Sequence, residues 1–221
     1  HQPPMRGEQI MAYSDFTLPD LIKRFQLSVI ENQELFAEIE PAPVPPFLEN
    51  TLHESAPLGL AINTEKARSE MIIAPILIEL RKMTGRKISL FSGQDFTVAP
   101  EQGLTGFCDF IISRSPEQLF IVAPAMIVVE AKNENIKGGL GQCLAAMLAA
   151  QIFNARNGVE IESVFGAVTT GNLWKFVKLT QQTAIIDRYE YHVNELERLL
   201  GVLLHIVGAD YVAQAEQKIA A

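Results

Sequence analysis

The feature that most constrains the fold is a short apolar run that ends abruptly in charge. Residues 126–129 are four successive apolar residues, and Glu130, Ala131 and Lys132 follow them directly. Such a run, rich in β-branched residues, is typical of a strand buried on both faces in the middle of a sheet. Because side chains alternate along a strand, Glu130 and Lys132 are expected on one face and Ala131 on the other. The pattern therefore predicts a buried strand over residues 125–132 with two ionisable side chains at its end.

The rest of the chain alternates between helical and extended patterns. Apolar residues at helical spacing predict helices over 16–39, 64–83, 138–157 and 194–220, with a kink near 71–75 caused by Pro75 and a possible interruption at Gly208. Extended patterns predict strands over 87–91, 95–98, 106–113, 163–170, 174–179 and 184–189, with Gly171-Asn172 as a hairpin turn. This order predicts an α/β fold in which helices flank a mixed central β-sheet.

A proline-rich segment suggests a division of the chain. Residues 41–46 read Pro-Ala-Pro-Val-Pro-Pro, and proline both fixes the backbone and removes hydrogen-bond donors. We therefore expect an extended linker there. The predicted organisation is an N-terminal helical extension with its linker over residues 1–46 and the main domain over residues 47–221.

Composition narrows the class of protein further. Hydrophobic residues make up 48% of the 221 residues, which excludes wholesale disorder, and the apolar runs are interrupted too early to predict a membrane span. No secretory signal is visible, and Cys108 and Cys143 lack metal-ligand spacing, so we expect a reduced, cytoplasmic setting. The formal net charge of −8 argues against tight nonspecific binding of nucleic acid, although a local basic patch stays compatible with it.

A third ionisable residue lies in an apolar setting upstream. Asp109 stands between Cys108 and Phe110 in the predicted strand over 106–113, although Asp is a poor strand former. If the two strands are neighbours, Asp109 and Glu130 converge on one hard divalent cation, Mg²⁺ or Mn²⁺, with Lys132 on the same face. The simpler alternative is that Glu130 and Lys132 form only an ion pair at the end of a strand.

The arrangement of an acid in one strand and Glu-Ala-Lys at the end of the next resembles the PD-(D/E)XK nuclease superfamily. The resemblance covers about residues 70–179 and implies a restriction endonuclease-like fold. It implies that Asp109, Glu130 and the main-chain carbonyl of Ala131 bind the metal, and that Lys132 positions or activates water. Cys108 stands where the family's name has a proline, a departure that many members share.

Two more positions match that pattern. Many members carry an acid on the helix before the sheet and a glutamine on the helix after the lysine strand. Glu70 and Gln142 occupy these places. The resemblance implies that Glu70 supports the metal site as a ligand or acceptor, and that Gln142 orients Lys132 or a phosphate.

The function implied by the resemblance is Mg²⁺-dependent hydrolysis of phosphodiester bonds in nucleic acid, with DNA the expected substrate. The alternative is a catalytically inactive domain of the same fold that binds nucleic acid or protein. A hydrolase of another phosphate ester is a third reading, which no residue specifically supports. We also expect a homodimer, because the first and last predicted helices have broad apolar faces and cutting two strands commonly uses two active sites in this family.

Overall fold

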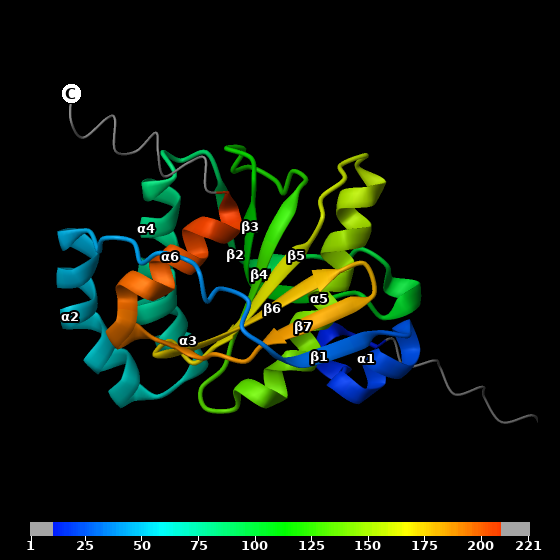
Figure 1. The fold of residues 1–221 in the computed structure, drawn as a ribbon, viewed down its shortest axis with the longest axis horizontal. Coiled ribbons are helices and arrows are strands. Elements are labelled where there is room, and N and C mark those ends of the chain that lie inside the picture. The colour runs from blue at the N-terminus through cyan, green and yellow to red at the C-terminus, as the bar shows by residue number, and fades with distance from the viewer. Residues whose placement is uncertain (1–10, 209–221) are drawn as a thin grey trace, which may run out of the picture.

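The sheet of the computed structural model runs in the order β1-β7-β6-β5-β4-β3-β2, and β8 pairs with β6 (Figure 1). The structure describes residues 11–208. Within that range the strands are β1 (Ser28–Gln33), β2 (Ser89–Asp95), β3 (Phe107–Ser113), β4 (Ala125–Ala131), β5 (Val164–Thr169), β6 (Leu173–Thr180), β7 (Thr183–Asp187) and β8 (Tyr191–His192). The pairs β1–β7 and β4–β5 are parallel and the other pairs are antiparallel, so the predicted mixed sheet is confirmed.

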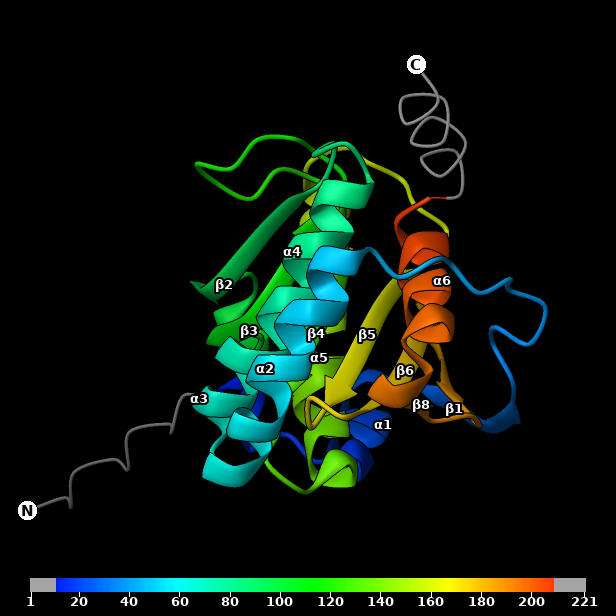
Figure 2. The same ribbon diagram turned by 90° about the vertical axis from the view of Figure 1, so that its left-hand side faces the viewer.

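Helices cover both faces of this sheet (Figures 1 and 2). One face carries α5 (Ile136–Arg156) with α1 (Leu18–Phe25) packed on it. The other carries α2 (Pro46–Ile62), α3 (Glu65–Arg68), the π-helix η2 (Ser69–Ile73), α4 (Ala74–Met83) and α6 (Leu196–Val207). Single 3₁₀ turns lie at η1 (Tyr13–Asp15), η3 (Pro100–Gln102) and η4 (Val193–Glu195). Each face has its own hydrophobic core, so the central strands are buried on both sides, as the run at 126–129 predicts.

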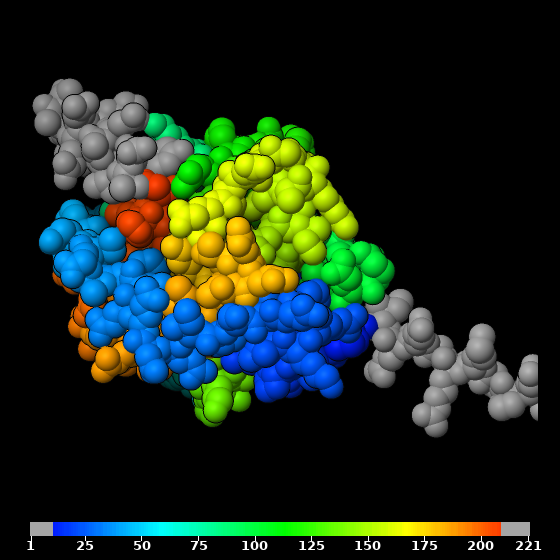
Figure 3. Space-filling model, turned by 45° about the vertical axis from the view of Figure 1, so that its right-hand side comes forward, coloured from blue at the N-terminus to red at the C-terminus, as the bar shows by residue number. Residues whose placement is uncertain are grey.

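The predicted helix over residues 16–39 is wrong. Helix α1 begins after the capping residue Thr17 and ends at Phe25, where Gln26 takes a left-handed φ of 53°. Residues 28–33 then form β1, which runs parallel to β7 at one edge of the sheet. In Figure 3 the blue N-terminal segment lies against the orange segment that contains β7. Short stretches such as Val29 and Ile30 fit either period, and pairing with β7 decides in favour of the strand.

The proline-rich segment after β1 is irregular, as predicted, but it is anchored to the domain. The Ala42 N–H donates a hydrogen bond to the carbonyl oxygen of Glu197 at 2.9 Å, and Ala42 is buried. A Cβ added to Gly201 of α6 would lie 2.3 Å from the carbonyl oxygen of Glu40. The segment therefore packs closely along α6, and it leads into α2, a helix that the sequence pattern did not predict.

The helix predicted over residues 64–83 is confirmed together with its interruption. Thr64 caps α3, and the chain passes through the π-helix η2 before α4 continues to Met83. Pro75 has no N–H to donate to the carbonyl four residues before it, that of Met71. The Ser55 hydroxyl of α2 donates to this carbonyl instead, at 2.6 Å, so the break in the helix costs no unsatisfied acceptor.

Most of the remaining elements agree with the patterns. One strand, β2, replaces the two short strands predicted over 87–91 and 95–98, and it ends at Asp95, so residues 96–98 are not a strand. The Gly171-Asn172 hairpin joins β5 to β6 as expected. The helix predicted over 194–220 is α6 from Leu196 to Val207, it ends before Gly208, where an interruption was predicted, and residues 209–220 of the prediction lie outside the described residues. Of the described helices, α5 alone is long and apolar enough to cross a membrane, but 61% of its most apolar stretch is buried within the protein.

Helix α5 is the element that spans the central strand from end to end. At its C-terminal end, the side-chain amide of Asn154 accepts from the N–H of Ala125 at 2.8 Å and donates to the Ala125 carbonyl at 3.0 Å. At its N-terminal end, Gln142 contacts Lys132, just past the end of β4. The β4–α5–β5 crossover thereby brings the start of α5 beside the charged end of the strand.

Candidate active site

Asp109 and Glu130 are neighbours near the ends of the antiparallel strands β3 and β4. The last pair of the ladder is Phe110 with Val129, Asp109 and Glu130 are the next residues along the two strands, and the charge of Asp109 contributes to raising the pKa of Glu130. The Asp109 carboxylate accepts a hydrogen bond from the N–H of Ala131 at 2.8 Å. Asp109 thus occupies the hydrogen-bonding place of a strand residue with its side chain, which accounts for an acid in an otherwise apolar strand.

Lys132 joins the strand end to α5. Its ammonium group lies 2.7 Å from Glu130 Oε1 and 3.3 Å from the side-chain oxygen of Gln142. The position of Gly139 permits this approach, because an added Cβ would lie 2.7 Å from Val168 and 3.2 Å from two carbons of the Lys132 side chain. The structure therefore brings Asp109, Glu130, Lys132 and Gln142 together. The ion pair of the simpler reading is also present, within this larger cluster.

Burial and a neighbouring acid both disfavour the charged form of Glu130. Glu130 is only 3% exposed, and burial, followed by the charge of Asp109, raises its pKa to about 8, against the opposing effect of Lys132. Burial by itself would lower the pKa of Lys132, but the hydrogen bond and charge of Glu130 raise it. Two acids crowded together in this way favour a bound cation or a proton, as like charges in other sites do.

The structure does not bring Glu70 to these residues. Glu70 lies in η2 with its side chain 61% exposed, and its ion pair is with Lys66 at 3.7 Å. The residues of this helical segment that face the core are Ala67, Arg68, Ile72 and Ile73, which leaves position 70 on the solvent side. The exposed acid Glu65, five residues earlier, is closer electrostatically: its charge contributes, after larger effects of burial and of the Glu130–Lys132 pair, to the raised pKa of Glu130 and of Lys132.

Sequence reasoning missed Glu65 because the segment offers several acids and no periodicity distinguishes them. One available signal was position: Glu65 follows the helix-capping Thr64 directly, so it lies at the end of the helix rather than along its side. The end of a helix that packs on a sheet is where a side chain can reach the strand ends.

Arg68 fixes the short helix that carries Glu65. The residue is 8% exposed, and its guanidinium donates to the Thr170 carbonyl at 2.5 Å, to Asn172 Oδ1 at 3.1 Å and to Asn63 Oδ1 at 2.9 Å. Thr170 follows β5 directly, and the carbonyl of Thr169 accepts from the N–H of Lys132 at 2.8 Å. One guanidinium thus ties α3 to the strand end that holds the main chain of Lys132.

The two cysteines are packed in the core. Cys108 and Cys143 are both buried and unpaired with each other. Burial, followed by the charge of Glu130, raises the pKa of each thiol, so neither is a reactive thiolate at neutral pH. Cys143 lies beneath the cluster as a small apolar side chain and adds no ligand to it.

The donor set fits a cation that needs few protein ligands. Within residues 11–208, no group of three or more His, Cys, Asp or Glu side chains is close enough to form a metal cage. Mg²⁺ usually keeps several waters and takes only one or two protein carboxylates, together with substrate phosphates. Asp109 and Glu130 supply two carboxylates of that kind, and the burial of Glu130 with a second acid beside it is the observation that favours a cation there.

Comparison with known proteins found no relative of this chain. No family model matches the chain, and searches of curated proteins and of solved structures gave no match. The site must therefore be judged on its own geometry.

Proposed function

We propose that the chain is a metal-dependent nuclease with a restriction endonuclease-like fold, hydrolysing phosphodiester bonds in nucleic acid. The observation that carries the proposal is the buried carboxylate Glu130, opposed by Asp109 and hydrogen-bonded to Lys132 at 2.7 Å. Buried like charges are costly unless a ligand compensates them, and perturbed carboxylates of this kind concentrate at functional sites. The order of these residues along the strands also matches the PD-(D/E)XK pattern.

Each residue has a role that its contacts support. Asp109 and Glu130 would hold Mg²⁺ or Mn²⁺, with the carbonyl of Ala131 as a further ligand. Such a cation supplies Lewis acidity toward a phosphoryl oxygen and a lowered pKa of a bound water. Lys132 carries the positive charge that stabilises negative charge developing on the phosphate. Gln142 holds the Lys132 ammonium group in place from α5, at 3.3 Å.

Cleavage assays with Mg²⁺ and with Mn²⁺, over single-stranded, duplex and branched DNA and over RNA, test the proposal. Asp109→Asn keeps an acceptor for the Ala131 N–H but removes the charge, and Lys132→Met removes the ammonium group. We expect each to lower the cleavage rate by about 100-fold or more. Glu38→Gln, at an exposed position, is the matched control and should cleave normally. Full activity in both site variants would refute the assignment.

Calorimetric titration with Mn²⁺ separates binding from chemistry. Binding should be lost in Asp109→Asn and kept in Lys132→Met. Comparing Glu65→Gln with Glu70→Gln then decides which acid supports the site. We expect Glu65→Gln to weaken Mn²⁺ binding more, since the charge of Glu65 acts on Glu130.

The second candidate, an inactive domain of this fold that binds nucleic acid or protein, is favoured by one observation. The net charge of −8 opposes the long-range attraction on which most nucleases rely. Under this alternative the protein binds no Mn²⁺ at Asp109 and cleaves none of the substrates above.

A further inference from the structure

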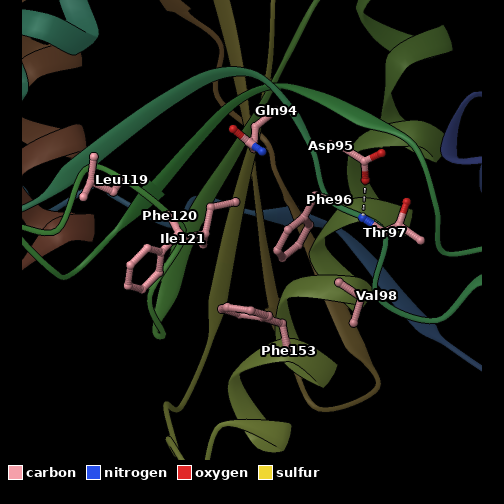
Figure 4. Close-up of a pocket in the computed structure, with 9 residues that line it drawn as sticks. All are labelled: Gln94, Asp95, Phe96, Thr97, Val98, Leu119, Phe120, Ile121 and Phe153. Carbon is pink, nitrogen blue, oxygen red and sulfur yellow. Dashed lines mark hydrogen bonds between the residues drawn. The ribbon is translucent and has the colours of Figure 1, made fainter.

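A second concave site lies on the α5 face of the sheet, beside the free edge of β2. Its volume is about 310 Å³, and it is open to solvent. Residues from three separate segments line it: the end of β2 with the turn after it, the loop before β4, and the C-terminal half of α5. Figure 4 shows Phe96, Phe120 and Phe153 around the open space, with Gln94 above it. The site is small and suits one ring system rather than a long chain.

One side of this pocket is formed by packed aromatic rings, and the other side by exposed apolar side chains. Phe96 and Phe153 form an edge-to-face pair with ring centroids 5.4 Å apart, which fixes two walls. Opposite them, Phe120 is 62% exposed and Leu119 is 88% exposed. Large apolar side chains presented on a loop beside a hollow mark a binding surface more often than a structural need. Flat aromatic faces at such a place are suited to stacking on another flat ring.

The pocket also offers one uncommitted polar group. The side-chain amide of Gln94 makes no hydrogen bond to any other residue of the described range, and it carries both donors and an acceptor. Asp95, in contrast, turns to the N–H of Thr97 and accepts from it at 3.0 Å. An amide can pair with the donor and acceptor edge of a base, as glutamine does with adenine.

The pocket and the candidate active site are formed from neighbouring elements of the sheet and from one shared helix. Gln94 is paired with Cys108 across β2 and β3, and Cys108 is the neighbour of Asp109. The two sites also share α5: Gln142 and Phe153 are eleven residues apart on it, about 16 Å along the helix axis. At about 3.4 Å for each stacked nucleotide, one strand held at both places would span about five nucleotides.

The charge of the lining residues distinguishes two modes of binding nucleic acid, which are attraction to the phosphates and stacking on the bases. None of the nine lining residues is Lys or Arg, and the chain as a whole has a net charge of −8. Within the pocket itself, no lysine or arginine can supply affinity through attraction to phosphates. Stacking of bases on aromatic side chains can, and it requires bases that are not paired in a duplex.

We propose that the pocket formed by Gln94, Phe96, Phe120 and Phe153 binds one unpaired base of a single-stranded nucleic acid whose backbone passes the Asp109–Glu130 cluster. This inference rests on the proposed function and narrows its substrate class to single strands or to duplexes with unpaired segments. Phe120 and Gln94 are the residues that determine specificity. Phe96 and Phe153 form the fixed wall against which the base stacks.

Fluorescence anisotropy with a labelled 20-nucleotide DNA, as a single strand and as the matching duplex, tests the proposal in EDTA, where no cleavage occurs. We expect the single strand to bind at least about tenfold more tightly than the duplex. Phe120→Ala should weaken its binding by about fivefold or more, the loss of one stacked base, and Phe120→Trp should restore it. Phe47→Ala is the matched control, since Phe47 is 67% exposed on the opposite face of the sheet. It should bind normally.

Salt provides an independent readout. Between about 50 and 200 mM NaCl, a protein held by six to ten phosphates loses about 10³-fold or more in affinity. We expect a loss of less than about tenfold here. Equal binding by Phe120→Ala and Phe47→Ala, equal affinity for single strand and duplex, or a steep salt dependence would each overturn the inference. So would chemical-shift changes at Gln94 and Phe120 caused by a short apolar peptide and not by the oligonucleotide.

These experiments distinguish failure of the pocket proposal from failure of the nuclease proposal. Binding that depends on Phe120 but occurs without any metal-dependent cleavage would leave the pocket intact and refute the nuclease. Cleavage that depends on Asp109, with unchanged KM and affinity in Phe120→Ala and Gln94→Ala, would leave the nuclease intact and refute the pocket.

Discussion

Replacing Glu130 by glutamine should stabilise the metal-free protein at high pH. The Glu130 carboxyl has a pKa of about 8 in the folded protein against 4.5 as its ordinary value. Between these values the folded state holds more protons than the unfolded state, so the stability of the wild-type protein falls as the pH rises. The difference of about 3.5 pH units corresponds to about 5 kcal/mol at about 1.36 kcal/mol per unit. The Glu130→Gln variant carries no such penalty, and its amide oxygen can still accept from Lys132.

Urea unfolding in EDTA measures this effect directly. The single tryptophan, Trp174, is fully buried, so its fluorescence reports loss of the core. We expect Glu130→Gln and the wild-type protein to differ by less than about 1 kcal/mol near pH 5, and the variant to be more stable by up to about 5 kcal/mol near pH 9. Asp109→Asn should act in the same direction by a smaller amount, because burial contributes more than Asp109 to the raised pKa.

The control and the refuting result are both simple. Glu38→Gln makes the same chemical change at an exposed position and should give a difference from the wild-type protein that does not change with pH. A pH-independent difference for Glu130→Gln as well would show that the carboxyl is not held neutral by its surroundings. The argument for a cation at this place would then lose its physical basis.

Three further substitutions test the packing around the site by urea unfolding. Arg68→Ala removes the guanidinium that binds Thr170 and Asn172 and should lower the free energy of unfolding by about 3 kcal/mol. Arg68→Lys should recover part of this loss. A loss below about 1 kcal/mol would contradict the proposed link between α3 and the β5–β6 turn. Gly141→Ala places a Cβ 2.2 Å from the Phe16 carbonyl oxygen and should cost about 1 to 3 kcal/mol, whereas an unchanged midpoint would mean that α1 is free to move away from α5. Asn154→Ala leaves both main-chain groups of Ala125 unpaired and should cost about 2 kcal/mol, and a neutral effect would show that water replaces the amide.

The central part of the fold could be predicted because its signals are local. The apolar run before Glu130 can be satisfied only by a strand buried on both faces, and alternation then places Glu130 and Lys132 on one side. The loop between Ser113 and Ala125 is short enough that β3 and β4 pair, which brings Asp109 close to Glu130. Gln142 was predicted from the resemblance to the family pattern, and the crossover helix α5 places it beside Lys132.

What could not be predicted depends on partners that are distant in sequence. Residues 28–33 become a strand only because β7, about 150 residues later, offers an edge. Helix α2 has apolar residues around much of its surface and includes Pro57, so it gives no clean period. Glu65 is distinguished from Glu70 only by the way α3 and η2 pack. Arg68 fixes that packing, but its role cannot be recognised without its partners on the β5–β6 turn.

The parallel pairing of β1 with β7 has a consequence for how the chain is made. At a synthesis rate of about 5 to 20 residues per second, β1 leaves the ribosome roughly 10 to 30 s before the strand it needs. During that interval the sheet has an open side, and unpaired edges invite association with other chains. For the same reason, a shortened protein beginning at residue 47 would keep the whole Asp109–Glu130 cluster and yet leave β7 uncovered. Its loss of solubility would be a defect of assembly and not of the site.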